Sequence, residues 1–283
     1  MKIAWIGTGV MGATMASQLV RGGYRIKAEN RTVEKAQNLE PLVSAQTSIK
    51  DTVEDADIVF TIVGYPKDVE ETFNDIFKHA PKGSILVDMT TSSPSLAAKL
   101  HTEGQSLGYH VLDAPVTGGD LGAINATLSI MVGGDKDIYN KVYPLFELMG
   151  KTINYMGEAG NGQNAKLANQ AAIAGSIAGA AEALTYAKLK NIDLTTMLDV
   201  IVGGSASSWQ AANNGPKMIE DDKSPGFFIK HFFKDLNLIL DEKEDLKLDV
   251  VENVVKIYDT LIEAGYNDCG TQAIFEYYLD QLK

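Results

Sequence analysis

Short apolar runs alternate with helical patterns over the first half of the chain. Six runs rich in Ile, Val, Leu and Phe predict strands at residues 2–7, 24–30, 57–63, 84–90, 109–115 and 127–134. Stretches between them, such as residues 11–20 and 67–77, predict helices, and weaker patterns at 43–45 and 152–156 indicate two short strands. Strands and helices that alternate in this way predict a doubly wound, mostly parallel α/β sheet.

The hydrophobic pattern changes near Gly160. Beyond it strand-like runs all but disappear, and an alanine-rich stretch from about residue 162 to 190 predicts one helix roughly 40 Å long. Further helices are expected at residues 194–202, 232–244, 249–264 and 271–282. We therefore expect an α/β domain at residues 1–160 and an all-helical domain at residues 161–283, joined by the long helix.

Composition narrows the possible partners. The formal net charge of −12 disfavours nucleic acid and anionic membranes, and 45% hydrophobic with 22% charged residues is typical of a soluble globular enzyme. The single cysteine, Cys269, excludes an intramolecular disulfide and favours a cytoplasmic location. The four histidines do not fall in metal-ligand or catalytic-triad spacing, so no metal is expected.

Three glycines, Gly7, Gly9 and Gly12, separate the first predicted strand from the first predicted helix. In a G-x-G-x-x-G turn the first glycine makes the tight turn, the second admits a pyrophosphate and the third lets helix and strand pack closely. This context predicts a Rossmann-type dinucleotide-binding loop. The residues expected to contact the cofactor here are Gly7, Thr8, Gly9, Val10, Met11 and Gly12.

The end of the second predicted strand bears on the choice of cofactor. NAD enzymes commonly place an acid there to bind the ribose, but this chain has Asn30, followed by Arg31 and Thr32. An arginine with a hydroxyl suits a 2′-phosphate, so these three residues favour NADP. NAD remains the alternative if Glu29 ends the strand in the place of the acid.

Three further motifs narrow the range of protein families that the sequence can resemble. They are DAPVTGGDLGAINATLSIMVGG at residues 113–134, GNGQNAKLANQ at 160–170 and FFKDLNLIL at 232–240. With the glycine loop, they resemble the β-hydroxyacid dehydrogenase family, which includes 3-hydroxyisobutyrate dehydrogenases and tartronate, glyoxylate and succinic semialdehyde reductases. The resemblance covers essentially the whole chain. It implies a Rossmann-type domain, a long interdomain helix and an all-α domain.

The motif around residue 117 can bind a carboxylate. Gly118 and Gly119 expose consecutive backbone N–H groups, and Thr117 adds a hydroxyl. The family usually carries serine in place of Thr117, so the extra methyl group could narrow the pocket. We expect these three residues to bind the substrate.

The resemblance implies that Lys166 is the proton donor and acceptor. Asn169 and Gln170 lie three and four residues further along the same helix and share its face. Many family members have asparagine where this chain has Gln170, so either amide could bind the substrate. Lys234 matches a second family lysine that lies near the nicotinamide, and it is expected at both the cofactor and the substrate.

The resulting expectation is a nicotinamide-dependent oxidoreductase that acts on a small β-hydroxy acid or carboxylate-bearing semialdehyde. An imine-reductase-like enzyme and a non-catalytic cofactor-binding module on the same fold are the alternatives, which the retention of Lys166 disfavours. The long helix has small-residue faces, and family members form dimers and tetramers, so a homodimer or homotetramer is expected. The particular substrate and the physiological direction stay open.

Overall fold

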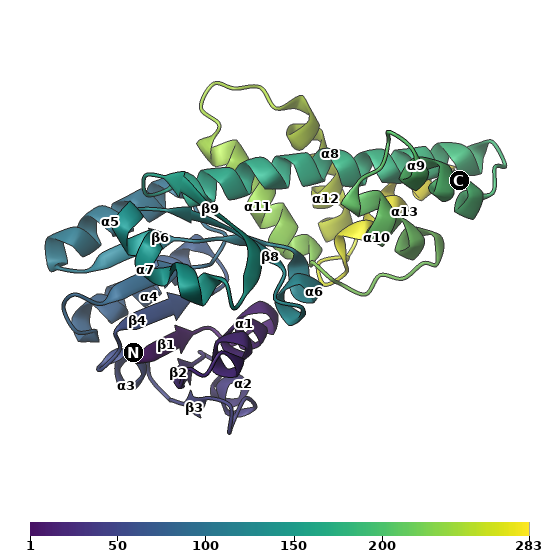
Figure 1. The fold of residues 1–283 in the computed structure, drawn as a ribbon. Helices are drawn as coiled ribbons and strands as arrows, with labels where there is room; N and C mark the ends of the chain where they lie inside the picture. Colours follow the sequence, from purple (N-terminus) through teal and green to yellow (C-terminus); the bar gives the residue numbers. More distant parts are fainter. Residues whose placement is uncertain (283) are drawn as a thin grey trace. The chain divides into compact units, whose positions relative to one another are not determined.

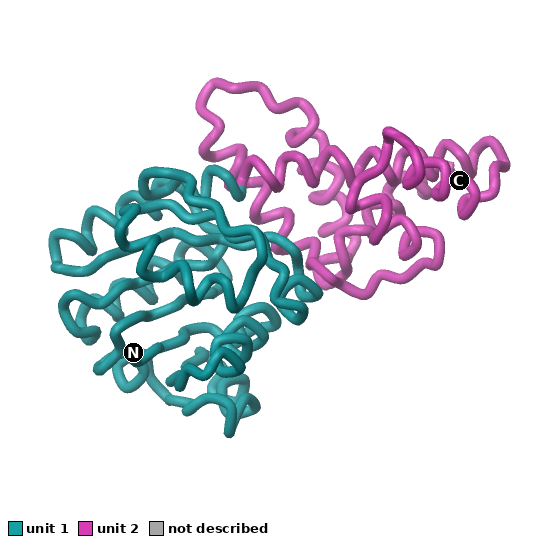
Figure 2. Tube along the Cα trace, in the orientation of Figure 1, with its two compact units in different colours: residues 1–166 teal, residues 167–283 magenta. Residues whose placement is uncertain are grey.

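Residues 1–282 are described by the structure, a computed structural model, and contacts divide the chain into two compact units. The units are Met1–Lys166 and Leu167–Lys283, coloured separately in Figure 2. Buried apolar side chains form two clusters in the first unit and one in the second. Each unit therefore has a hydrophobic core of its own.

The first unit is built on one nine-stranded sheet (Figure 1). Its strands are β1 (Ile3–Ile6), β2 (Ile26–Glu29), β3 (Ser44–Ala45), β4 (Ile58–Thr61), β5 (Ile85–Asp88), β6 (His110–Asp113), β7 (Val116–Thr117), β8 (Leu128–Gly133) and β9 (Gly150–Gly157). They run in the order β3-β2-β1-β4-β5-β6-β8-β7, with β9 paired to β8. The six strands from β3 to β6 in this order, including β2 and β1, pair in parallel, whereas β8 is antiparallel to β6 and β7. The predicted mostly parallel fold is confirmed.

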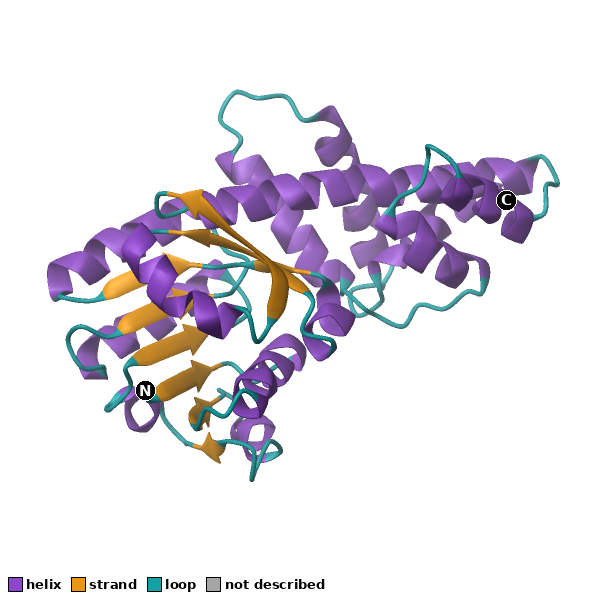
Figure 3. Cartoon of the chain, in the orientation of Figure 1, coloured by secondary structure: helices purple, strands orange, loops and turns teal. Residues whose placement is uncertain are grey.

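Helices cover both faces of this sheet (Figure 3). They are α1 (Val10–Arg21), α2 (Val33–Gln37), α3 (Ile49–Val53), α4 (Pro66–His79), α5 (Pro94–Leu107), α6 (Gly119–Ile124) and α7 (Lys136–Phe146). Side chains of α1, α6 and α7 enter one core cluster, and those of α3, α4 and α5 enter the other. The central strands are buried on both faces, which explains why they read as continuous apolar runs in the sequence.

The second unit is helical. Its elements are the greater part of α8 (Asn161–Leu189), then α9 (Leu194–Gly203), α10 (Trp209–Ile219), α11 (Ile229–Glu242), α12 (Asp249–Glu263), η1 (Thr271–Ala273), α13 (Ile274–Leu279) and η2 (Asp280–Leu282). The long helix α8 was predicted to within about one residue at each end. Within residues 1–282, no helix is both long and apolar enough to cross a membrane.

Two features of the second unit differ from the sequence expectation. Helix α10 was not predicted, because its Asn-Asn-Gly-Pro stretch has low helix propensity. The Ser208 side chain accepts a hydrogen bond from the Ala211 amide and so caps its first turn. The single helix expected at residues 271–282 is divided into η1, α13 and η2.

Candidate active site

The glycine loop joins β1 to α1, and its first and third glycines are required by packing. A Cβ on Gly7 would lie 2.1 Å from the Ile62 carbonyl oxygen, and one on Gly12 would lie 2.0 Å from the Gly7 carbonyl oxygen. Gly7 also has φ of +95°, which favours glycine. Apart from its neighbours in the chain, no described residue has an atom within 4 Å of a Cβ built on Gly9. The middle glycine therefore leaves space beside the N-terminus of α1, where a pyrophosphate would bind.

The loop also contains an unsatisfied polar atom. Thr8 is only 4% exposed, and its hydroxyl oxygen has no hydrogen-bond partner among residues 1–282. Buried hydroxyl groups are normally paired, so an unpaired one beside an open glycine turn fits a site that receives a polar ligand. Val10, which begins α1, is 66% exposed. The residues present therefore fit a dinucleotide.

Asn30 braces the glycine loop from the end of β2. Its Oδ1 accepts a hydrogen bond from the Thr8 amide at 2.9 Å, and its Nδ2 donates to the Thr32 carbonyl oxygen at 3.0 Å. This amide therefore connects the loop after β1 to the loop after β2. A structural role of this kind was not foreseen from the sequence, because the two partners are 22 residues apart.

Two charged residues flank Asn30. Glu29 ends β2 but is only 8% exposed, and burial, together with the nearby charge of Asp75, raises the pKa of its carboxyl group. The Arg31 side chain is 88% exposed, and its guanidinium donates a hydrogen bond to Asp68 Oδ1 at 3.1 Å. The arginine thus lies in solvent at the end of β2, whereas the acid is buried.

The Thr-Gly-Gly motif forms the turn between β7 and α6. Thr117 ends β7, and Gly118 and Gly119 have φ of +132° and +64°. Two successive residues in this region favour glycine at both positions, because a Cβ would strain the backbone. The turn therefore exposes main chain without side chains after Thr117.

Lys166 lies on α8 and is the last residue of the first unit. Its exposed fraction is 5%. Lysine is rarely buried to this degree in an ordinary solvated helix. A buried lysine on this helix is therefore a candidate for chemistry.

A polar chain in the second unit connects the remaining predicted site residues. Asn169 Nδ2 donates to Gln170 Oε1 at 3.1 Å, and Gln170 Nε2 donates to Asp235 Oδ2 at 2.8 Å. Lys234 Nζ forms an ion pair with Asp235 Oδ1 at 3.0 Å. Gln170 and Asp235 are both 1% exposed. Asp235 therefore holds two predicted site residues at once.

One histidine belongs to the same helix as Lys234. Burial lowers the pKa of His231, and the positive charges of Lys234 and Lys230 lower it further. The imidazole is therefore biased toward its neutral form. No group of three His, Cys, Asp or Glu side chains within residues 1–282 is placed to hold a metal ion.

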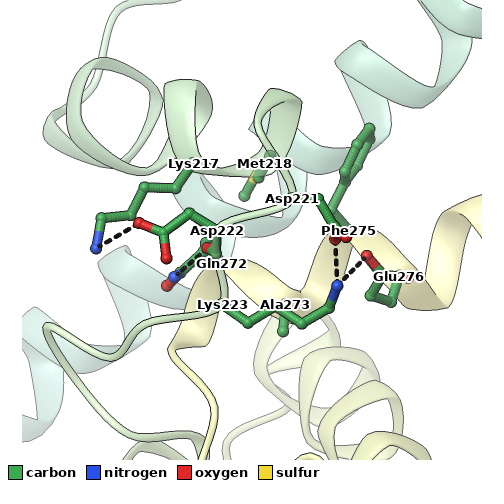
Figure 4. Close-up of a pocket in the computed structure, with 9 residues that line it drawn as sticks. All are labelled: Lys217, Met218, Asp221, Asp222, Lys223, Gln272, Ala273, Phe275 and Glu276. Carbon is green, nitrogen blue, oxygen red and sulfur yellow. Dashed lines mark hydrogen bonds and ion pairs between the residues drawn. The ribbon is translucent and has the colours of Figure 1, made fainter.

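A small depression in the second unit lies between α10 and η1–α13 (Figure 4). Gln272 Nε2 donates to the Asp222 carbonyl oxygen at 2.8 Å, and Lys223 pairs with Asp221 and Glu276. The cavity of about 10 Å³ accommodates one water molecule at most. These contacts fasten the loop after α10, and the depression is too small for a substrate.

Comparisons with known proteins agree with this geometry. Residues 2–157 match the NAD binding domain of 6-phosphogluconate dehydrogenase, and residues 160–278 match the NAD-binding domain of NADP-dependent 3-hydroxyisobutyrate dehydrogenase. A probable 3-hydroxyisobutyrate dehydrogenase-like protein of Arabidopsis thaliana is 42% identical over 280 residues, covering 96% of this chain and 84% of the relative.

Two further relatives match this chain over nearly their full lengths. The 2-hydroxy-3-oxopropionate reductase of Escherichia coli is 39% identical over 283 residues, covering 98% of this chain and 96% of the relative. The structure of Mycobacterium tuberculosis 3-hydroxyisobutyrate dehydrogenase with L-serine superimposes with a TM-score of 0.90 at 29% identity, covering 97% of this chain and 98% of the other. The chain therefore belongs to the β-hydroxyacid dehydrogenase family of NAD(P)-dependent oxidoreductases.

Proposed function

We propose that this protein is an NADP-preferring enzyme that interconverts a small β-hydroxy acid and the corresponding carboxylate-bearing aldehyde or ketone. The observation that carries the proposal is the burial of Lys166, on the helix whose next turn bears Asn169 and Gln170. A lysine removed from solvent, on the helix that also bears two amides, is suited to proton transfer. The two domains would be residues 1–160 for the cofactor and 161–283 for substrate contacts and assembly.

The cofactor would lie against the glycine loop and the end of β2. Its pyrophosphate would meet the amides at the start of α1, where Gly9 leaves room and the Thr8 hydroxyl has no hydrogen-bond partner among residues 1–282. Arg31 and Thr32 would contact a 2′-phosphate. The exposed pair of Arg31 with Asp68 costs little to rearrange, which supports NADP. A bound nicotinamide supplies the hydride.

The substrate would be held by groups at both of its ends. The Thr117 hydroxyl and the amides of Gly118 and Gly119 would bind its carboxylate. Lys166 would donate a proton to the oxygen of the reduced carbonyl and accept it in the reverse direction. Lys234, paired with Asp235, would contact cofactor and substrate from α11.

The hydrogen bonds of Gln170 favour Asn169 as the substrate-binding amide. Both ends of the Gln170 amide are engaged, by Asn169 and by Asp235. Asn169 is only half-buried, so it is the amide with an accessible surface. Gln170 would then orient Asn169 rather than touch the substrate.

The proposed assembly is a homodimer or homotetramer. Tyr186, Leu189 and Val200, near the end of α8 and on α9, are exposed by more than half of their surface. Large apolar side chains exposed to this extent favour burial against another subunit. Light scattering of the purified protein measures the number of copies.

The function is tested by oxidation of NADPH and NADH with glyoxylate, succinic semialdehyde, tartronate semialdehyde and methylmalonate semialdehyde. Lys166→Ala should lower kcat by about 10²- to 10⁴-fold, the usual contribution of general acid–base catalysis. Lys141→Ala is the control, because Lys141 lies exposed on α7, is not among the proposed site or interface residues, and should leave kcat unchanged. Equal rates for Lys166→Ala and the wild type would refute the role of Lys166. Cofactor binding without turnover of any of these substrates would favour a binding module.

A further inference from the structure

A buried carboxylate caps the first turn of α8. Asp113, the last residue of β6, is only 3% exposed. Its Oδ1 accepts a hydrogen bond from the Gly160 amide at 2.8 Å, and its Oδ2 accepts one from the Gln163 amide at 2.9 Å. Burial raises the pKa of Asp113, whereas these amides act in the opposite direction. A negative charge here also complements the dipole at the start of the helix.

Gln163 supplies a second connection between this turn and the sheet. Its Oε1 accepts a hydrogen bond from the Ser92 amide at 2.9 Å, and its Nε2 donates to the Thr90 carbonyl oxygen at 2.7 Å. Gln163 is fully buried, and Thr90 and Ser92 follow β5. The start of α8 is therefore fastened to the carboxyl ends of two neighbouring strands.

Two glycines bring the helix and the sheet into direct contact. A Cβ on Gly162 would lie 2.5 Å from the Met131 carbonyl oxygen and 2.6 Å from that of Asp113. A Cβ on Gly133 would lie 2.8 Å from the Gly162 amide nitrogen. The first turn therefore has no room to shift toward the sheet, and its hydrogen bonds oppose movement away from it.

We propose that Asp113 and Gln163 are positioning residues that set the place of Lys166 for proton transfer. Lys166 follows Gln163 by three residues and so lies on the same side of α8. Asp113 precedes Thr117 by four residues, so its carboxylate also connects the helix of the proton donor to the segment that leads into the Thr-Gly-Gly turn. The inference rests on the role proposed above for Lys166.

The test replaces the carboxylate with its closest neutral analogue. In Asp113→Asn, the side-chain NH₂ group replaces one of the two oxygens that accept hydrogen bonds from the Gly160 and Gln163 amides. One of these hydrogen bonds therefore becomes a contact between two donors. We expect kcat/KM to fall by about 100-fold, the effect of misplacing a catalytic group by roughly 1 Å. The Kd for NADPH, measured by fluorescence, should stay within a factor of three.

Asp88→Asn is the matched control. Asp88 is the register partner of Asp113 on β5 and is equally buried. Its Oδ1 accepts the hydrogen bonds of the Thr61 hydroxyl and the Thr90 amide, and an asparagine oxygen can replace it there. This variant tests the same substitution at the same edge of the sheet, and it should keep kcat/KM within threefold of the wild type.

A double-mutant cycle separates positioning from general damage. If Asp113 acts through Lys166, Asp113→Asn should cause no further loss of single-turnover rate in a Lys166→Ala background. An equal fractional loss in both backgrounds would overturn the proposal, as would wild-type activity of Asp113→Asn alone. Wild-type activity of Lys166→Ala would instead refute the proposed function, and the positioning role with it.

A milder variant covers the case in which Asp113→Asn does not fold. Gln163→Met keeps the side-chain volume and the Asp113 cap but removes both hydrogen bonds to the loop after β5. We expect about a 10-fold loss of kcat/KM that again disappears in the Lys166→Ala background. A folded Gln163→Met protein with unchanged activity, or with the same loss in both backgrounds, would overturn the proposal.

Discussion

Replacing Gly162 by alanine places a methyl group where α8 meets the sheet. Its Cβ would lie 2.5, 2.6 and 2.7 Å from three oxygen atoms, the carbonyl oxygens of Met131 and Asp113 and the Oδ2 of Asp113. Two of these atoms are main chain within or at the end of β8 and β6, and the third is fixed by its bond to the Gln163 amide. None of them can swing aside as the end of a long side chain would.

Two opposing effects decide the size of the change in stability. Alanine favours a helix over glycine by about 1 kcal/mol. Inserting a methyl group into a filled space costs about 1–3 kcal/mol, and more where the neighbours are rigid. With three contacts under 3.0 Å, the steric cost should exceed the gain in helix propensity by about 1–2 kcal/mol. This loss corresponds to a fall in Tm of about 2–8 °C for a domain of this size.

The same helix provides a control of opposite sign. Beyond the backbone of its own helix and its chain neighbours, no described atom lies within 4 Å of a Cβ on Gly179, so Gly179→Ala should gain about 0.5–1 kcal/mol from helix propensity alone. Calorimetry of both variants compares the two effects directly, and kcat/KM of Gly162→Ala should fall with its stability, because the turn before Lys166 is displaced. A Gly162→Ala protein as stable as the wild type would refute the reasoning. A destabilised Gly179→Ala protein would indicate that another subunit packs on that face.

Two further predictions concern cofactor choice and pH. Arg31→Ala should weaken NADPH binding by about 10- to 100-fold, the value of a charge-assisted hydrogen bond, and leave NADH nearly unchanged. Asp68→Asn should tighten NADPH binding by removing the carboxylate charge that competes for Arg31. Equal losses for the two cofactors in titrations of Arg31→Ala would contradict the NADP assignment. Burial raises the pKa of Asp88 to about 6 from 3.8, so the folded state binds this proton more tightly than the unfolded state does. The protonated carboxyl therefore contributes about 3 kcal/mol to the free energy of unfolding at low pH, and this contribution is lost as pH rises from 4 through 6. Asp88→Asn should therefore gain Tm relative to the wild type at pH 8 but not at pH 4, and parallel Tm–pH curves would count against this account.

The sequence by itself determined the elements whose signals are local. Strands buried on both faces require continuous apolar runs, and the glycine turn after β1 requires glycines at two positions for packing. The long helix was predicted because alanine-rich sequence favours helix over nearly 30 residues. Helix α10 was not predicted, because its Asn-Asn-Gly-Pro stretch has low helix propensity and tertiary packing overrides that propensity.

Only the tertiary structure decided how the candidate site is supported. Lys166, Asn169 and Gln170 are neighbours on one helix, so their spacing was visible in the sequence. The partners that hold the site are remote, because Asp113 meets Gln163 from 50 residues away and Gln170 meets Asp235 from 65. A hydrogen bond depends on distance and angle in space rather than on separation along the chain. For this reason the sequence could supply the reacting groups, whereas the fold alone supplied their supports.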